Sequence, residues 1–501
     1  MTFCESWTTS APSASARRLL QAPILRIAVA CGGFSACSVG PDYVSAGLAV
    51  PARYAEATRP VKPPTDLGHW WKTFHDPVLD RLIDEAVAGN LDVSAAAARI
   101  REARATRLVA VGGLFPVVYG DASAIETKLP GKGAAPPAWL FRAGFDASWE
   151  LDLFGGQRRA VEAATRGVEA ADAGLRATLL TLIGDVNTNY IEMRGAEARI
   201  SLASQTAASQ RQTAGLTKSM FEAGSSSELD LANATALAAS TEAVVPQLEQ
   251  SRALSIHRLG ILLGREPGAL LARLRRGAPL PQPHDRLRPG LPADLLSRRP
   301  DIAMAERQLA QATARIGVAD AALYPSVSLT GSIATSASRI GDLGKGFTIG
   351  WSWGPSLTVP IFAGGQLVAA VDVAGAQRDE TRLALQSLVL TAMEEVENSL
   401  VLLSQERIRM HQLGKSAGSY RQADQLSKKL WQAGAVAFLS VLDAERSLYS
   451  AEDALIQSRI LISIDAIALA KALGGGWDDP VDVDHPLVLD ANTGPHLVEA
   501  Q

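Results

Sequence analysis

The 501-residue chain lacks the residue patterns that build metal, disulfide or nucleic-acid sites. Its cysteines, Cys4, Cys31 and Cys37, all lie near the N-terminus, so the rest of the chain can form neither a disulfide nor a cysteine-based metal site. The histidines never stand at ligand spacing such as i, i+4. The formal net charge of −4, with bases scattered among acids, gives no basic surface for a phosphate backbone. We therefore expect no cofactor, no metal and no nucleic acid.

Long apolar runs are also absent. No stretch reaches the roughly 18 uncharged apolar residues of a membrane-spanning helix, so a membrane role requires a β-barrel or an anchor. Enzyme motifs are missing as well: Gly414-Lys415-Ser416 resembles the end of a phosphate loop, but position 409 is Arg409 instead of the first glycine. We expect the protein not to be an enzyme.

The N-terminus supplies a candidate anchor. Basic residues precede a short apolar run at 27–36, the order typical of a secretory signal. The run ends in Phe34-Ser35-Ala36-Cys37, which resembles a lipobox with phenylalanine in place of the usual leucine. We predict a signal peptide at 1–36 and lipidation of Cys37. An unprocessed signal with a chance cysteine, or use of Cys31, are the alternatives.

Proline is absent from two very long stretches, although the chain contains 26 prolines. None occurs at 155–245 or at 362–479. A helix over the first stretch as far as Gly224 would be on the order of 100 Å long at about 1.5 Å per residue. Such a length far exceeds the width of a globular domain, so we predict long helices that leave the body of the protein.

The chain is also duplicated. Leu114-Phe115-Pro116 recurs as Leu323-Tyr324-Pro325, and Phe154-Gly155-Gly156-Gln157 recurs in the segment 362–366. Both pairs are in the same register, about 209 positions apart, as is the pair Leu91-Asp92 and Pro300-Asp301. A unit of this length is far longer than a solenoid repeat, so the sequence indicates a tandem duplication of a large unit.

Each unit shows the same order of elements. An alanine- and arginine-rich helix, at 76–112 and then at 299–321, ends before a proline-containing corner. Alternating apolar residues then predict strands at 117–128 and 139–153, and at 326–336 and 347–361. Helical hairpins follow at 155–264 and 364–473, broken near Gly224 and Gly434. The predicted organisation is a signal peptide at 1–36, an extended segment at 37–75, repeats at 76–264 and 299–474 separated by a linker at 265–298, and a tail at 475–501.

Apolar residues in the second long helix follow coiled-coil spacing. They are Leu385, Val389, Ala392, Val396, Leu400 and Leu403. A structural coiled-coil periplasmic lipoprotein without a pore would explain this spacing, but it leaves the duplicated β-hairpins without a role. Four strands per chain are too few to close a barrel, whereas three chains would give an even number within the range of membrane barrels. The predicted fold class is therefore mainly α with membrane β, a trimeric channel with a 12-stranded β-barrel continued by an α-helical barrel.

Several motifs together resemble the outer-membrane-factor family of efflux systems, of the TolC/NodT type. They are the segment 39–43 after Cys37, Trp70-Trp71 before Phe74, the segment 298–302, the corner 323–325 and the segment 441–444. The similarity covers essentially the whole mature chain. It implies a homotrimer that acts as a passive exit channel, with a periplasmic adaptor protein and an inner-membrane pump of the resistance-nodulation-division type as partners. By the same resemblance, Ser38 after the cysteine indicates outer-membrane lipid as the location of the anchor.

The resemblance also implies functional residues near the helix tips. Asp443 matches an aspartate ring at the periplasmic gate, Leu439 an apolar constriction, and Arg446 an arginine that ties neighbouring helices. Trp431 stands where the family often has tyrosine. The alternative for Asp443 is a solvated residue paired with Arg446 along one helix.

Gly224 and Gly434 match the hairpin tips at which the family meets its adaptor, although glycine is also expected there as a helix C-cap. The sequence leaves the exported substrate open among drugs, metal ions and other small molecules.

Overall fold

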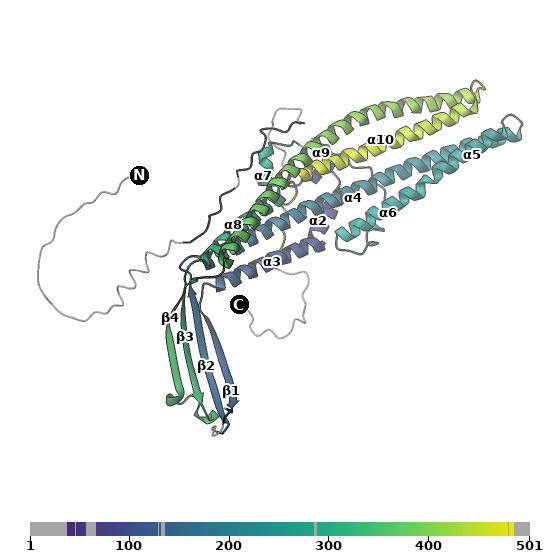
Figure 1. Cartoon of the computed structure of the whole chain (residues 1–501). Helices are drawn as coiled ribbons and strands as arrows, with labels where there is room; N and C mark the ends of the chain where they lie inside the picture. The colour runs from purple at the N-terminus through teal and green to yellow at the C-terminus, as the bar shows by residue number, and fades with distance from the viewer. Residues whose placement is uncertain are drawn as a thin grey trace, which may run out of the picture.

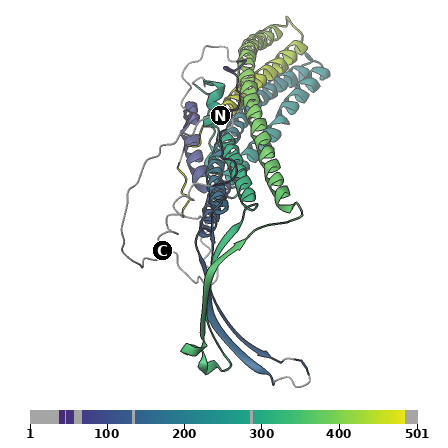
Figure 2. The same ribbon diagram turned by 60° about the vertical axis from the view of Figure 1, so that its left-hand side comes forward.

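The computed structural model describes residues 38–45, 47–56, 67–128, 130–131, 136–284, 288–478 and 480–484. The predicted signal peptide at 1–36, Cys37 and the end of the tail at 485–501 lie outside the described residues. The molecule is elongated, with four strands at one end and the tips of two helical hairpins at the other (Figure 1). The second view shows the same separation (Figure 2).

The four strands form one antiparallel sheet in the order β1-β2-β3-β4. They are β1 (Val117–Thr127), β2 (Ala138–Leu151), β3 (Ser326–Ala337) and β4 (Ile349–Thr358). Each repeat contributes one hairpin, and β2 pairs with β3 to join the two repeats. The strands β1 and β4 therefore lie at the edges of the sheet, each paired on one side only within the chain.

Helices make up the remainder of the fold. The first repeat contains α2 (Pro77–Gly89), α3 (Leu91–Gly112), α4 (Gly156–Glu222), α5 (Glu228–Glu242) and α6 (Val244–Leu262). The second contains α8 (Pro300–Ala321), α9 (Gln366–Gln432) and α10 (Phe438–Ala472), preceded by the short α7 (Leu295–Arg298). Short 3-10 helices are η1 (Trp70–Phe74), η2 (Arg273–Arg275), η3 (Pro292–Asp294), η4 (Ile340–Asp342) and η5 (Gly346–Thr348). Within the part of the chain that the structure describes, no helix is both long enough and apolar enough to cross a membrane.

Two predicted helices are each divided in the structure. The helix expected at 76–112 breaks at Asn90, because the Asn90 side chain caps α3 by accepting the amides of Asp92 and Val93. The returning helix of the first hairpin divides at Ala243, between α5 and α6. Pro246, which has no amide hydrogen to donate to the preceding turn, follows at once and accounts for that break.

The main hydrophobic core lies midway along the molecule, where short elements cover the long helices. Trp71 of η1, Leu79 of α2, Tyr190 of α4 and Ile256 of α6 are all buried there. The predicted coiled-coil positions of α9 also belong to this core: Leu385, Val389, Ala392, Val396 and Leu403 are buried, and Leu400 packs against them. The sheet and the hairpin tips lie outside this central core, so other contacts hold them.

Candidate functional site

Residues directly opposite each other on neighbouring strands share a face of the sheet, and by this register one face is mostly apolar and the other mostly polar. Apolar residues in register are Val118, Phe141, Phe145, Trp149, Leu329, Ile333, Trp351 and Trp353. Polar residues on the other face are Asp121, Arg142, Asp146, Ser328, Thr330, Ser332, Ser352 and Ser356. On the apolar face, Trp351 and Trp353 are 71% and 73% exposed in the single chain. A soluble protein rarely exposes such a surface, so the apolar face requires a nonaqueous environment.

The polar face carries its own contacts. The hydroxyls of Ser332 and Ser352 lie 2.9 Å apart, and Arg142 forms an ion pair with Asp121 at 3.6 Å. Such a face suits contact with water. The sheet therefore separates an apolar from an aqueous compartment, as the wall of a membrane pore does.

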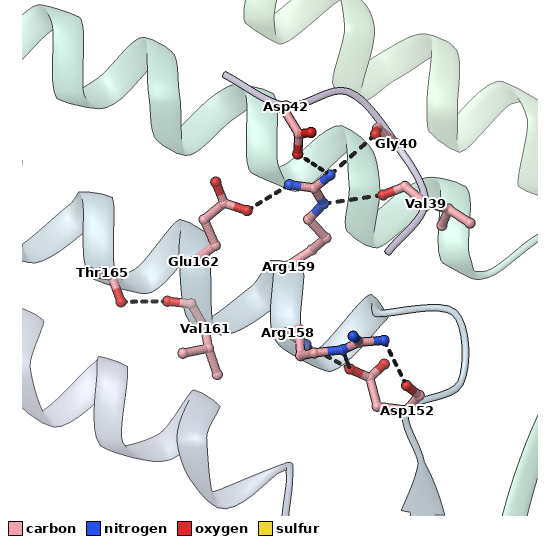
Figure 3. A network of polar contacts seen from close by, with 9 residues as sticks. All are labelled: Val39, Gly40, Asp42, Asp152, Arg158, Arg159, Val161, Glu162 and Thr165. Atoms are coloured by element: carbon pink, nitrogen blue, oxygen red, sulfur yellow. Dashed lines mark hydrogen bonds and ion pairs between the residues drawn. The ribbon is translucent and has the colours of Figure 1, made fainter. Parts of the chain in front are cut away.

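At the junction of sheet and helices, Arg159 of α4 binds the first described residues of the chain (Figure 3). Its guanidinium donates to the carbonyls of Val39 and Gly40 at 3.1 and 3.2 Å, to Asp42 at 2.7 Å and to Glu162 at 2.7 Å. Burial lowers the pKa of Arg159, but the two carboxylates outweigh it and the pKa is raised. The arginine therefore stays charged and holds the segment.

Glycine also allows the segment to pack closely against α8. A Cβ on Gly40 would lie 2.4 Å from the Cα of Gly317 in α8, and Gly40 has a φ of +86°. Further along, the hydroxyls of Tyr43 and Ser45 donate to Glu306 of α8. The N-terminal segment thus connects the first repeat, through α4, to the second repeat, through α8.

This segment ends at the middle of the molecule. The amides of Ala55 and Glu56 both donate to the carboxylate of Glu397 in α9, at 2.7 and 3.0 Å, and Tyr54 is buried beside them. At its other end, Ser38 packs against Gly155, the residue that precedes α4.

Sequence reasoning did not find Arg159, although a signal was present. By the register of the repeat, Arg159 corresponds to Val368 and Glu162 to Val371. The first repeat therefore has a charged pair where the second repeat has two valines. This difference indicates a contact that only the first repeat makes. The segment 39–43, selected as a family motif, also gains a physical role because it supplies three of the four groups that Arg159 binds.

The motif at 298–302 has a structural role as well. The Arg299 guanidinium lies 2.7 Å from Asp301 and 2.5 Å from Glu395 of α9, and it donates to the carbonyl of Ala472 at the end of α10. It therefore ties together the three helices of the second repeat at the centre of the molecule.

At the opposite end, the hairpin tips lie where the sequence places them. Gly224 and Gly434 have φ values of +76° and +71°, and nothing lies within 4 Å of a Cβ built on either. The positive φ therefore favours glycine at both positions. The space outside each tip is open. Leu439 and Asp443 lie on α10, just after the second tip, and are exposed in the chain.

The four predicted gate residues are divided between two environments. Arg446 lies 3.9 Å from Asp443, and both side chains are mostly exposed, so this pair contributes little to stability. Trp431 instead packs within the hairpin, with its ring 5.0 Å from that of Phe438. It covers a small apolar cluster made by Ala234, Leu237, Phe438, Val441 and Leu442.

The comparison with known proteins decides the family. The family model described as outer membrane efflux protein matches residues 82–265 and 291–475. The chain belongs to this family.

Nodulation protein T of Rhizobium leguminosarum bv. trifolii is 34% identical over 417 residues, covering 83% of this chain and 89% of that protein. Pyoverdine export outer membrane protein OpmQ of Pseudomonas aeruginosa is 32% identical over 467 residues, covering 90% and 97%. The solved outer-membrane channel OprN is 36% identical, with a TM-score of 0.83, and covers 88% of this chain and all of that one.

These similarities confirm the predicted family and the TolC-like channel fold, and the two family matches correspond to the two repeats. The protein is an exit channel for efflux in the bacterial outer membrane, and it extends into the periplasm. Its relatives are channels and export proteins.

Proposed function

We propose that three copies of this outer membrane efflux protein assemble into one tube, the passive outer-membrane exit of a tripartite efflux system. The observation that carries the proposal is the sheet, with one apolar face, one polar face and two edge strands that pair on one side only. In lipid, an unpaired edge is too costly, so β4 of one copy pairs with β1 of the next. The apolar face then meets lipid and the polar face lines the lumen.

Passive export also needs partners that supply energy. The family resemblance favours a periplasmic adaptor protein and an inner-membrane pump of the resistance-nodulation-division type. The open space around Gly224 and Gly434 supports docking of the adaptor at these tips.

A tryptophan at either glycine should abolish cross-linking to the adaptor while trimers persist. Gly418→Trp controls for bulk alone, because Gly418 lies within α9 and also has nothing within 4 Å of its added Cβ. Unchanged cross-linking of the tip variants would remove the docking role.

Near the second tip, Asp443, Leu439, Arg446 and Trp431 form the periplasmic gate in this proposal. Three Asp443 carboxylates around the axis would attract cations and repel anions. The exposure of Asp443 and Leu439 in the single chain supports this role, because both remain available to face the lumen. Trp431 contributes by packing the α9 end of the hairpin against Phe438.

Conductance of the purified protein in planar lipid bilayers tests the pore and the gate together. We expect the wild type to form ion-conducting pores, and the Asp443→Ala, Arg446→Ala variant to show higher conductance and weaker cation selectivity. Liposomes that do not swell in the presence of the wild type would favour the structural lipoprotein without a pore. Unchanged conductance and selectivity of the variant would instead leave the pore and remove the gate.

Lipidation of Cys37 is the remaining part of the proposal. Its support is the lipobox-like segment Phe34-Ser35-Ala36-Cys37, which is followed by Ser38 packed against Gly155. Mass spectrometry of the mature protein should find acyl chains on Cys37 and none after Cys37→Ala. An unmodified N-terminus in the wild type would remove this part, and the pore would still be held by its strands.

A further inference from the structure

The loop between β3 and β4, residues 338–348, carries two large apolar side chains that face outward. We call it the outer loop. It contains η4 and η5 and lies at the free end of the strands, at the opposite end of the molecule from the helix tips (Figure 1). Ile340 is 70% and Phe347 is 80% exposed in the single chain. Their exposure beside the apolar face of the sheet marks an interaction surface.

Hydrogen bonds within the outer loop hold it in one shape. The amide of Asp342 donates to the carbonyl of Arg339 at 3.0 Å. The hydroxyl of Thr348 donates to two carbonyls, those of Asp342 and Lys345, at 3.0 and 2.8 Å. Lys345 also forms an ion pair with Asp342. The loop is therefore a fixed support for its exposed apolar side chains.

The outer loop is attached on the apolar side of the sheet. Thr335 stands two residues after Ile333 on β3, so its side chain is on the same, apolar face. Its hydroxyl oxygen accepts the amide of Gly344 at 2.8 Å and lies 2.8 Å from the hydroxyl of Thr348. Ala337, the next residue on this face, is only 7% exposed, whereas Ile333 is 49% exposed. The loop thus folds toward the apolar face, and not toward the polar face that lines the proposed lumen.

Neighbouring aromatic residues indicate which partner the outer loop meets. The rings of Trp139 and Phe141 on β2 stack with centroids 5.7 Å apart, and Phe141 is opposite Ala337 on the apolar face. Membrane barrels carry aromatic residues at this level, where the acyl chains meet the headgroups. Because the protein extends into the periplasm, the free end of its strands reaches the outer leaflet. The apolar surface of the loop continues that of the sheet, so lipid is the partner that fits both.

A cation beside the apolar side chains agrees with a lipid partner. Arg339 is exposed and directly precedes Ile340. At a membrane surface, a long basic side chain lays its stem along apolar groups and keeps its charge beside the lipid phosphates. The outer loop therefore offers both kinds of group that an anionic lipid surface binds.

We propose that the outer loop is an anchor in the outer leaflet, in which Ile340 and Phe347 insert among the acyl chains and Arg339 meets the lipid phosphates. This inference rests on the proposed function, because it needs the apolar face of the sheet to lie in lipid. It assigns the loop to the surrounding membrane and not to closure of the channel mouth.

Spin labels on single introduced cysteines test where the loop lies in the full-length trimer. The protein, in a Cys37→Ala background, is reconstituted into vesicles of phosphatidylethanolamine and phosphatidylglycerol. Collisions of the label with oxygen, which concentrates in lipid, and with a water-soluble nickel chelate separate lipid from water. Phe347→Cys carries the test label. Trp353→Cys on the apolar face is the lipid reference, and Ser332→Cys on the polar face is the lumen reference.

We expect the label at position 347 to resemble the lipid reference at 353. It should collide with oxygen several-fold more often, and with the nickel chelate several-fold less often, than the label at 332. Adding Arg339→Glu should raise the chelate collisions at 347 several-fold, because a carboxylate is repelled by the lipid phosphates. Native electrophoresis verifies the trimers, and Ile340→Cys supplies the same measurement if Phe347→Cys does not assemble.

The possible outcomes separate the anchor from the pore. Frequent chelate collisions at 347 and 340, with lipid values at 353, would place the loop in water and overturn the anchor while the pore remains. Few collisions with either reagent would show burial against another copy and overturn the anchor as well. Unchanged collisions after Arg339→Glu overturn the phosphate contact. A label at 353 that reports water overturns the proposed function, and the anchor with it.

Discussion

The Arg159 guanidinium lies 2.7 Å from the carboxylate of Asp42, a residue 117 positions earlier in the chain. This contact fixes the first described residues of the chain against α4, where the strands meet the helices (Figure 3). From there the N-terminal segment continues along α8 to Glu397 of α9. A short extended segment thereby joins the two halves of the duplication.

Replacing Arg159 should loosen this junction. Arg159→Met should lower the free energy of unfolding by about 2 kcal/mol, because two carbonyls and the partly buried Glu162 lose a donor. Thermal unfolding of the purified protein measures the loss, and limited proteolysis of the segment 38–56 should become faster. Asp42→Asn is the control, with a loss below about 0.5 kcal/mol because Asp42 is 87% exposed. Equal stability of Arg159→Met and the wild type would contradict the prediction.

The two hairpin tips are capped differently. Ser227 caps α5 by accepting the amide of Asp230, whereas α10 begins after Ala437, which has no capping side chain. The backbone angles of the two residues are similar, with φ of −86° and −69° and ψ of 155° and 150°. Ala437→Ser should therefore stabilise the second tip by about 1 kcal/mol, and Ser227→Ala should destabilise the first by a similar amount.

Hydrogen exchange of the amides at the start of α10 and of α5 measures the two effects separately. Slower exchange in α10 is expected for Ala437→Ser, and faster exchange in α5 for Ser227→Ala. No change in α10 would show that another group already satisfies its first amides.

At Gly434 the backbone, and not the available space, sets the cost of substitution. Its φ of +71° disfavours residues with a Cβ, yet the space around it is open. Gly434→Ala should cost about 1 kcal/mol and Gly434→Val more, whereas Gly434→Asn should cost less because asparagine tolerates this conformation. Thermal unfolding of the three variants should give that order, and an equal cost for all three would contradict the backbone argument.

Asp465 of α10 should make stability depend on pH. Burial, with a smaller contribution from Glu406, raises its pKa from 3.8 to about 6. Between these values the folded protein holds a proton that the unfolded chain releases, so the contribution of Asp465 to stability falls as pH rises through this window. Asp465→Asn should remove this pH-dependent loss of stability, because asparagine does not ionise. It should raise the unfolding temperature more at a pH of about 7.5 than at about 4.5, and an equal effect at both would contradict the prediction.

Local chemistry explains why much of the fold could be predicted from the sequence. Proline at 116 and 325, glycine at 155 and 365, and the alternation along the strands place the ends of the elements in both repeats. The tips were found for the same reason, since a positive φ requires glycine at 224 and 434. The break at Asn90 was missed because an asparagine inside a helical pattern gives no sign of which amides it will cap.

The sequence by itself determined the duplication, the long helices, the strands and the resemblance to outer membrane efflux proteins, because each depends on neighbours along the chain or on their repetition. Only the tertiary structure decided which side chains from distant parts of the chain come into contact. Arg159 finds Asp42 across 117 positions, and Glu445 finds Thr213 across 232. The first pair depends on how the N-terminal segment crosses α4 and the second on how the two hairpins pack, and no local pattern records that packing.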